Sequence, residues 1–220
     1  MMTATKRTPL SRDRVLDAAV GLADEIGLDA LTMRRLAEQL QVEVMSIYYH
    51  LPNKDAVLGG MVDRIFAETA EAMAAQAGPA EWKAAVRHRI LTSRAVMVRH
   101  PWAPKLIDSR TSMGLPLAMH VDAVIGTLRT GGFTMDQIHH GMHALGSRVY
   151  GYVHETAEPD GSQASVSQAL AQMADRVPNL VSMLMEASHG DPSTTLGWCD
   201  DQFEFEFGLD LLLDGLERLL

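Results

Sequence analysis

Among the residue types that can bind metals or act in catalysis, histidine has the most suggestive spacing in this sequence. His139 and His143 stand one helical turn apart, and Asp136 stands a turn earlier. Such spacing can bring metal ligands together on one helix face, so a helical metal-dependent enzyme using His139 and His143 is one alternative. The pattern lacks the His-Glu-x-x-His arrangement of zinc hydrolases, the single Cys199 is remote, and the other histidines are scattered. We therefore expect no metal, no cofactor and no catalytic residue.

Basic residues offer a second kind of chemistry, the binding of phosphates. The whole chain has a net charge of -9, but residues 1–58 carry seven Lys and Arg against eight Asp and Glu. The remaining residues carry 12 basic against 20 acidic side chains, so the acidity lies beyond residue 58. Because salt screens charges over roughly 10 Å, phosphate binding responds to the local charge. The charge distribution therefore permits the N-terminal part to bind nucleic acid without requiring it.

The remaining composition points away from membranes and secretion. No window reaches the roughly 18 apolar residues that span a bilayer, and no apolar segment follows Lys6 and Arg7 as it would in a secretory signal. A lone Cys199 cannot form an internal disulfide. We therefore expect a cytoplasmic protein that does not contact a membrane.

The elements that would position these residues are helices, because apolar residues recur at intervals of three and four with no convincing strand. Ser11, Thr32 and Asn53 are the expected N-caps of the first, second and fourth helices, and a short third helix follows the break at 41–43. A short turn or helix is bracketed by Pro101 and Pro104. Further helices are predicted over 81–99, 115–130, 134–155, 165–175, 179–187 and 196–220, with a capping box of Thr134 and Gln137 opening the third of these.

Three helices within fifty residues, the last two joined by a three-residue turn, are the skeleton of a helix-turn-helix. The segment 31–54 closely resembles the DNA-binding motif of the tetracycline-repressor (TetR) family. It shares the Leu-Thr-x-Arg-x-Leu-Ala opening, a valine in the turn, Tyr48-Tyr49-His50, and Asn53-Lys54-Asp55 at the start of the next helix. Gln41 departs from the family, which usually has glycine there, and adopts a left-handed turn only at some cost.

The motif implies a set of DNA contacts. We expect Thr32 near a phosphate and Arg34 at the backbone or a base edge. Val44, Met45 and Ser46 lead the recognition helix into the major groove, where the first two can make only apolar contacts, for example with a thymine methyl. The resemblance implies phosphate or groove-wall contacts for Tyr48, Tyr49, His50 and Lys54; the alternative for the two tyrosines is packing against the fourth helix.

The resemblance continues into the rest of the chain. Four segments look like the C-terminal domain of the tetracycline-repressor branch: 99–102, 131–134, 150–155 and 203–216. It implies a homodimer in which the helices 134–155 and 196–220 form a four-helix bundle with their copies. The last helix agrees physically, since it carries an apolar stripe of Phe203, Phe207, Leu211 and Leu212 that a two-fold interface would bury. Burial within one chain is the alternative.

The same resemblance implies a cavity for a small effector between the middle helices. Positions 105–107 are apolar where the tetracycline repressors have a drug-binding histidine, so neither tetracycline nor its metal is implied. We expect a largely apolar ligand with one or two polar groups. The candidate lining residues are Trp102, Ile107, Val121, Val124, His139, Met142, His143 and Glu155, the last contributed by the partner subunit.

The sequence thus predicts an all-α protein with a three-helix helix-turn-helix domain over 1–60 and a larger helical effector-binding and dimerisation domain over 61–220. The expected function is a ligand-responsive regulator, a repressor, that binds a palindromic DNA operator as a dimer and is released by the effector. A ligand-independent DNA-binding protein is the remaining alternative.

Overall fold

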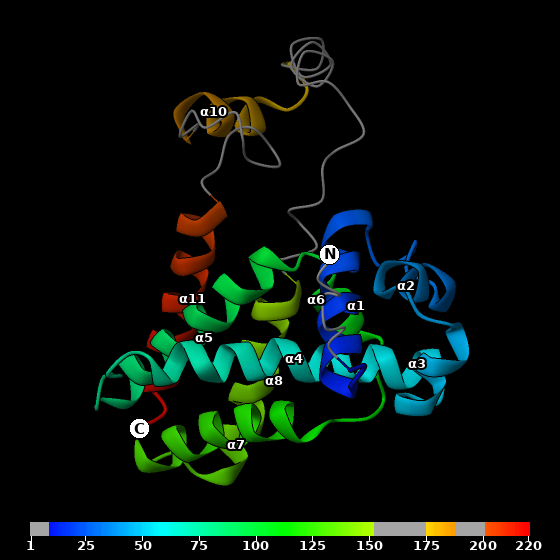
Figure 1. Cartoon of the computed structure of the whole chain (residues 1–220). Coiled ribbons are helices and arrows are strands. Elements are labelled where there is room, and N and C mark those ends of the chain that lie inside the picture. The colour runs from blue at the N-terminus through cyan, green and yellow to red at the C-terminus, as the bar shows by residue number, and fades with distance from the viewer. Residues whose placement is uncertain (1–8, 152–174, 188–200) are drawn as a thin grey trace. The chain divides into compact units, whose positions relative to one another are not determined.

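The computed structural model describes residues 9–151, 175–187 and 201–220, and all regular secondary structure within these ranges is helical (Figure 1). This confirms the all-α prediction. The chain divides into two compact units, residues 1–131 and 132–220. The division follows packing, so the predicted functional boundary near residue 60 stays a prediction. Among the described residues, no helix combines the length and the hydropathy that crossing a membrane requires.

Helices α1 (Arg12–Ile26), α2 (Met33–Leu40) and α3 (Val44–His50) begin the first unit. The hydroxyls of Ser11 and Thr32 accept hydrogen bonds from the third residue of each following helix, as the sequence predicts. Apolar side chains on one face of each helix form the shared core. Leu16 and Leu36 are 1% exposed and Ile47 is fully buried. The three helices therefore hold one another in place with only one side of α3 covered.

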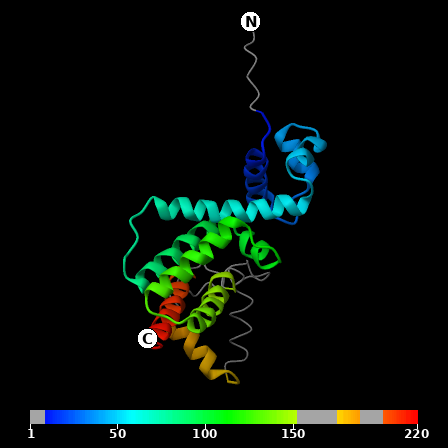
Figure 2. The same cartoon turned by 90° about the horizontal axis from the view of Figure 1, so that it is seen from below.

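Helix α4 (Lys54–Ala74) is the longest element and begins where Asn53 accepts from the backbone N of Ala56 at 2.7 Å. In Figure 2 it runs between α1–α3 on one side and α5 and α7 on the other. Gly60 permits its close approach to α1, because a Cβ there would lie 2.5 Å from a methyl carbon of Leu16. One helix thus touches both groups of helices in the unit.

The rest of the first unit consists of α5 (Trp82–Arg99), the short α6 (Ala103–Asp108) and α7 (Leu115–Thr130). The first and last of these pack on α4 and on each other. Met97 and Leu128 belong to their common core and are at most 1% exposed. The sequence predicted a short turn or helix bracketed by Pro101 and Pro104; the structure has a helix that contains Pro104 in its first turn and extends beyond it to Asp108.

The second unit contains α8 (Met135–Gly151), α10 (Pro178–Ala187) and α11 (Asp201–Glu217). Thr134 and Gln137 form the predicted capping box: the Gln137 side chain accepts from the backbone N of Thr134 at 2.8 Å, and the Thr134 hydroxyl from that of Gln137 at 3.3 Å. Residues 152–155, residues 165–174 of the predicted helix 165–175 and the predicted start of the last helix at 196 lie outside the described residues.

The buried face of α11 differs from the predicted stripe. Phe205, Leu209 and Leu213 are fully buried where α11 packs on α8, whereas the predicted Leu212 is only half-buried. Phe203, Phe207 and Leu211 are exposed on another face by 54%, 55% and 57%. The last helix is therefore apolar on two sides, and the predicted stripe combined the outer face with Leu212, which is half-buried, and omitted the inner residues.

Candidate nucleic-acid interface

The outward side of α3 carries most of the residues expected to contact DNA. Met45 is 73% exposed, Tyr49 is 86% exposed and Tyr48 is 36% exposed. Ile47, on the opposite side, is fully buried and anchors the helix to α1 and α2. The Tyr49 ring meets the His50 ring edge-on, with 5.2 Å between centroids. Because Tyr49 is 86% exposed, most of its surface is not covered by the described helices and is available to a partner.

Val44 and Ser46 are half-exposed beside Met45 in the first turn of α3. The residue before the helix, Glu43, makes no side-chain cap, so the amide groups of this turn donate no hydrogen bond to its carboxylate; its backbone carbonyl accepts from the backbone N of Ser46 at 2.9 Å. This first turn therefore faces outward with two apolar side chains and one hydroxyl.

Helix α2 places two polar candidates next to α3. Thr32 is exposed, and its hydroxyl accepts from the backbone N of Arg35 at 3.2 Å. Arg34 projects into solvent, with 86% of its side chain exposed, and pairs with Glu38 at 3.1 Å. An exposed pair of this kind is weak, so Arg34 can exchange the carboxylate for a phosphate or a base at small cost.

The turn between α2 and α3 has the left-handed backbone that the sequence suggested. Gln41 has φ 55° and ψ 47°, the one positive φ among non-glycine residues in the described part of the chain. The backbone N of Val42 closes the turn onto the carbonyl of Ala37 at 3.0 Å. Gln41 therefore keeps the geometry that glycine provides in the family, with a strained backbone.

The start of α4 lies beside this surface and is tied to the α6–α7 connection. Lys54 is exposed at the first position of the helix. The guanidinium of Arg110 donates two hydrogen bonds to the carboxylate of the adjacent Asp55, at 3.1 and 3.2 Å. Gly59 leaves room for this side chain, since a Cβ there would lie 3.2 Å from an Arg110 nitrogen. The loop after α6 thus holds the turn of α4 that carries Lys54.

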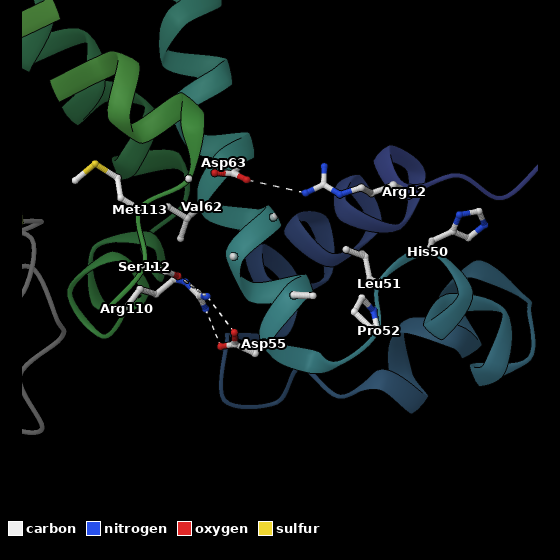
Figure 3. Close-up of a pocket in the computed structure, with 14 residues that line it drawn as sticks. Arg12, His50, Leu51, Pro52, Asp55, Val62, Asp63, Arg110, Ser112 and Met113 are labelled. Carbon is white, nitrogen blue, oxygen red and sulfur yellow. Dashed lines mark hydrogen bonds and ion pairs between the residues drawn. The ribbon is translucent and has the colours of Figure 1, made fainter. Parts of the chain in front are cut away.

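The contact of Arg110 with Asp55 borders a cleft of about 370 Å³ between the helix-turn-helix and the α6–α7 connection (Figure 3). Arg12 reaches Asp63 from α1 at 4.0 Å on another side of the cleft. Burial raises the pKa of Asp63 above its ordinary value, although the charges of Arg12 and Arg110 act in the opposite direction. Since two guanidiniums face two carboxylates here, the cleft has balanced charge and shows no preference for an ion of either sign.

A partly buried polar network forms a second link, which sequence reasoning missed. Nδ1 of His100 lies 2.8 Å from Asp24 of α1, and its Nε2 lies 3.1 Å from Glu68 of α4. The indole of Trp102 donates to the same oxygen of Asp24 at 2.7 Å. Burial raises the pKa of Glu68, but hydrogen bonds from Arg99 and His100 outweigh it and hold that pKa below its ordinary value. The residues before α6 are thereby fixed to the first helix.

The residues expected to contact an effector fall in both units. Trp102 is 7% exposed and Val124 5%, whereas Ile107 and Val121 are half-buried; all four belong to the first unit. The contact of Trp102 with Asp24 gives it a bridging position between α1 and α6. In the second unit, Met142 is half-buried and the two histidines of α8 are exposed. Glu155 lies outside the described residues. Their common role in one site stays a prediction.

His120, another residue absent from the predicted set, lies one turn before Val124 on α7. Its ring contacts Phe66 of α4 with 5.1 Å between centroids. Burial, together with the charge of Arg89, lowers the pKa of His120 to about 4. The imidazole is therefore neutral near pH 7 and can both donate and accept a hydrogen bond.

His139 and His143 do stand together on α8, with 4.7 Å between ring centroids. No group of three His, Cys, Asp or Glu side chains that could hold a metal ion occurs among the described residues. Asp136 instead lies 3.7 Å from His140. His139 and His143 therefore lie on one face as predicted, whereas Asp136, the suggested third ligand, lies near His140 instead.

Comparisons with known proteins agree along the whole chain. Residues 15–61 match the family described as "Bacterial regulatory proteins, tetR family", and residues 75–220 match "Tetracyclin repressor-like, C-terminal domain". A transcriptional repressor, DrrR1 of Streptomyces coeruleorubidus, is 32% identical over 96% of this chain and 78% of its own length. The class D tetracycline repressor of Escherichia coli is 26% identical over 94% of this chain and 89% of its own.

Solved structures give the same result. A possible TetR family regulator from Streptomyces coelicolor A3(2) superposes with a TM-score of 0.79 at 27% identity, covering 96% of this chain and all of that one. ActR of Streptomyces coelicolor in complex with (S)-DNPA superposes with a TM-score of 0.75 at 26% identity, covering 95% and 98%. With an exposed recognition helix, two matching family models and these relatives, the chain belongs to the TetR family of ligand-responsive, DNA-binding transcriptional regulators and is not an enzyme.

Proposed function

We propose that this protein is a repressor that binds a palindromic operator as a homodimer and leaves it when a small, largely apolar effector binds. The observation that carries the DNA-binding half is the division of α3 into a fully buried Ile47 and an outward side where Met45 and Tyr49 are 73% and 86% exposed. A helix held by its inner face and open on its outer face is what a recognition helix requires.

The candidate residues on and around α3 divide into two proposed roles. Thr32, Tyr48, Tyr49, His50 and Lys54 contact phosphates or the groove wall and fix the register of the helix on DNA. Arg34, Val44, Met45 and Ser46 face base edges in the major groove. Support comes from exposure, because Thr32 and Lys54 are exposed at the N-terminal ends of α2 and α4, where a helix dipole also favours phosphate.

The proposed dimer forms through the helices 134–155 and 196–220. Phe203, Phe207 and Leu211 follow one another at single-turn spacing on the exposed face of α11, and the two phenylalanine rings stack with 6.5 Å between centroids. An apolar stripe of this kind favours association with a second copy. Two copies would present two recognition helices to half-sites about 34 Å apart, hence the palindrome.

The proposed effector is an apolar, ring-containing molecule with a few polar groups. Among the similar structures, ActR is seen in complex with actinorhodin and with (S)-DNPA, and a single-residue variant of TetR from Acinetobacter baumannii AYE with minocycline. The predicted lining, Trp102, Ile107, Val121, Val124, His139, Met142, His143 and Glu155, is mainly apolar. The neutral imidazole of His120, next to Val124, adds one group that can pair with a phenol or a carbonyl.

The DNA-binding half is tested by gel shift on an operator selected from random duplex DNA. Tyr48→Ala and Lys54→Ala should each weaken binding about tenfold, and Lys54→Ala should lower the slope of log affinity against log salt by about 1. Lys105→Ala is the matched control, because Lys105 is exposed on α6 outside the surface around α3. Unchanged binding by both test variants would show that this surface does not contact DNA.

The effector half is tested by thermal shift with a panel of aromatic metabolites and drugs, followed by operator release. A ligand that binds only the folded protein, at a free concentration of 100 times its Kd, should raise the free energy of unfolding by roughly 2.7 kcal/mol. A compound that raises the melting temperature and also releases the operator identifies the effector class. Operator binding that persists with every stabilising compound would favour the ligand-independent alternative.

A further inference from the structure

The first turn of α3 presents an apolar surface where a recognition helix usually presents hydrogen-bonding groups. Met45 is 73% exposed and Val44 is half-exposed, and neither side chain carries a group that reads a base by hydrogen bonding. The next residue toward the core, Ile47, is fully buried. Ser46, which lies between Met45 and Ile47 in the sequence, supplies the one hydroxyl of this turn. The exposed methionine and half-exposed valine offer apolar surface that a partner can bury.

The position of this turn restricts what can cover it. In a helix-turn-helix the N-terminal residues of the recognition helix meet base edges in the major groove. Only one base presents an apolar group there, since thymine carries a 5-methyl and the other base edges display donors and acceptors. A donor or acceptor facing Val44 or Met45 would lose its water and gain no partner, which disfavours those bases.

Polar reading by neighbouring residues does not replace this contact. Arg34 projects from α2, and its guanidinium pairs with Glu38 of the same helix at 3.1 Å. Tyr48 follows one turn after Val44 on the same helix. These side chains can read or position other parts of the site, so the bases opposite the first turn of α3 are left to the apolar pair and to the hydroxyl of Ser46, which accepts either a donor or an acceptor and selects no single base.

We propose that Met45 and Val44 read thymine 5-methyl groups, so that each half-site of the operator holds thymine opposite the first turn of α3. The inference rests on the proposed operator binding and adds the base chemistry of the site. It predicts specificity that depends on a methyl group and not on a hydrogen bond.

The experiment replaces each thymine of the selected operator, one position at a time, by deoxyuridine, which lacks only the 5-methyl and pairs identically. At one or two positions of each half-site the substitution should weaken wild-type binding about fourfold, the effect of one buried methyl group. The same substitution should cost Met45→Ala or Val44→Ala almost nothing, because the apolar partner of the methyl is already gone.

Met113→Ala is the matched control, a methionine that is 59% exposed in the α6–α7 connection, and it should keep the full deoxyuridine penalty. The proposal is overturned if no position shows a penalty in the wild type, or if the penalties persist unchanged in both Met45→Ala and Val44→Ala. If the selection enriches no DNA sequence at all, the proposed function fails instead, so the two failures are distinguishable.

Discussion

Among the described residues other than glycine, Gln41 alone adopts a backbone conformation that disfavours its side chain. The family resemblance located the conflict, and the left-handed backbone at φ 55° confirms it. Replacement by glycine removes a strain of about 1 kcal/mol, of which the greater freedom of glycine in the unfolded chain offsets a part. Gln41→Gly should therefore raise the free energy of unfolding by up to about 1 kcal/mol in chemical denaturation. An equal or lower stability would show that the Gln41 side chain makes contacts that compensate for the strain.

The low pKa of His120 should make the free energy of unfolding depend on pH. Its pKa is about 4 in the folded chain and near 6.5 when unfolded, so the unfolded state binds the extra proton first as pH falls. The stability contributed by the neutral imidazole is complete above pH 6.5 and is lost as pH falls toward 4, by on the order of 3 kcal/mol. In His120→Gln the free energy of unfolding should fall less over this window. Curves with the same slope in both proteins would contradict the assignment. The exposed His140 provides a matched control as His140→Gln.

At the scale of elements, local signals explain most of what the sequence predicted. Helices α1, α2 and α4 begin where Ser11, Thr32 and Asn53 cap them, because a cap depends on residues three apart in the chain. The anchoring of α6 was not predictable in this way. Its contacts join Trp102 to Asp24 and Arg110 to Asp55, 78 and 55 residues apart, and nothing in the local sequence records such pairs.

The pair of Arg110 and Asp55 gives a test of how firmly the α6–α7 connection holds α4. Asp55 is 77% exposed on its side chain, so the pair should contribute no more than about 1 kcal/mol despite its bidentate geometry. A double-mutant cycle with Arg110→Ala and Asp55→Ala should show a coupling of about 0.5–1 kcal/mol in urea denaturation. Arg110→Lys keeps the positive charge but loses the two-pronged guanidinium, so it should retain less than half of the coupling energy.

A second probe of the same contact comes from Gly59→Ala. A Cβ at 3.2 Å from the Arg110 nitrogen must displace the guanidinium. If the pair matters, the alanine should lower the coupling measured in the cycle. A coupling near zero in the parent protein would mean that the pair of Arg110 and Asp55 does not hold the α6–α7 connection to α4.

At the scale of the whole molecule, composition and periodicity predicted the fold class, whereas the faces of the last helix needed the structure. The sequence stripe of Phe203, Phe207, Leu211 and Leu212 mixed two faces, because α11 also carries Phe205, Leu209 and Leu213 toward α8. A helix apolar on two sides cannot be divided by periodicity alone. The exposed face is the part that the proposed dimer would bury.

If the proposed dimer forms through the exposed face of α11, a charge at Phe207 should disrupt it. A charge placed in an apolar interface is buried without a partner and disfavours association. Phe207→Asp should therefore shift the protein toward monomer in sedimentation velocity, with its helical circular dichroism kept because Phe207 is 55% exposed in the single chain. Operator affinity should fall more than tenfold, since each half-site would then bind alone.

Leu115→Asp separates this interface from a general effect of placing a charge on an apolar surface. Leu115 is 73% exposed at the first position of α7, in the other unit, and an aspartate is favourable at a helix N-terminus. This variant should remain dimeric and keep its operator affinity. If Phe207→Asp also remains dimeric at micromolar concentration, the exposed face of α11 is not the interface, and the palindromic operator would need a different pairing of subunits.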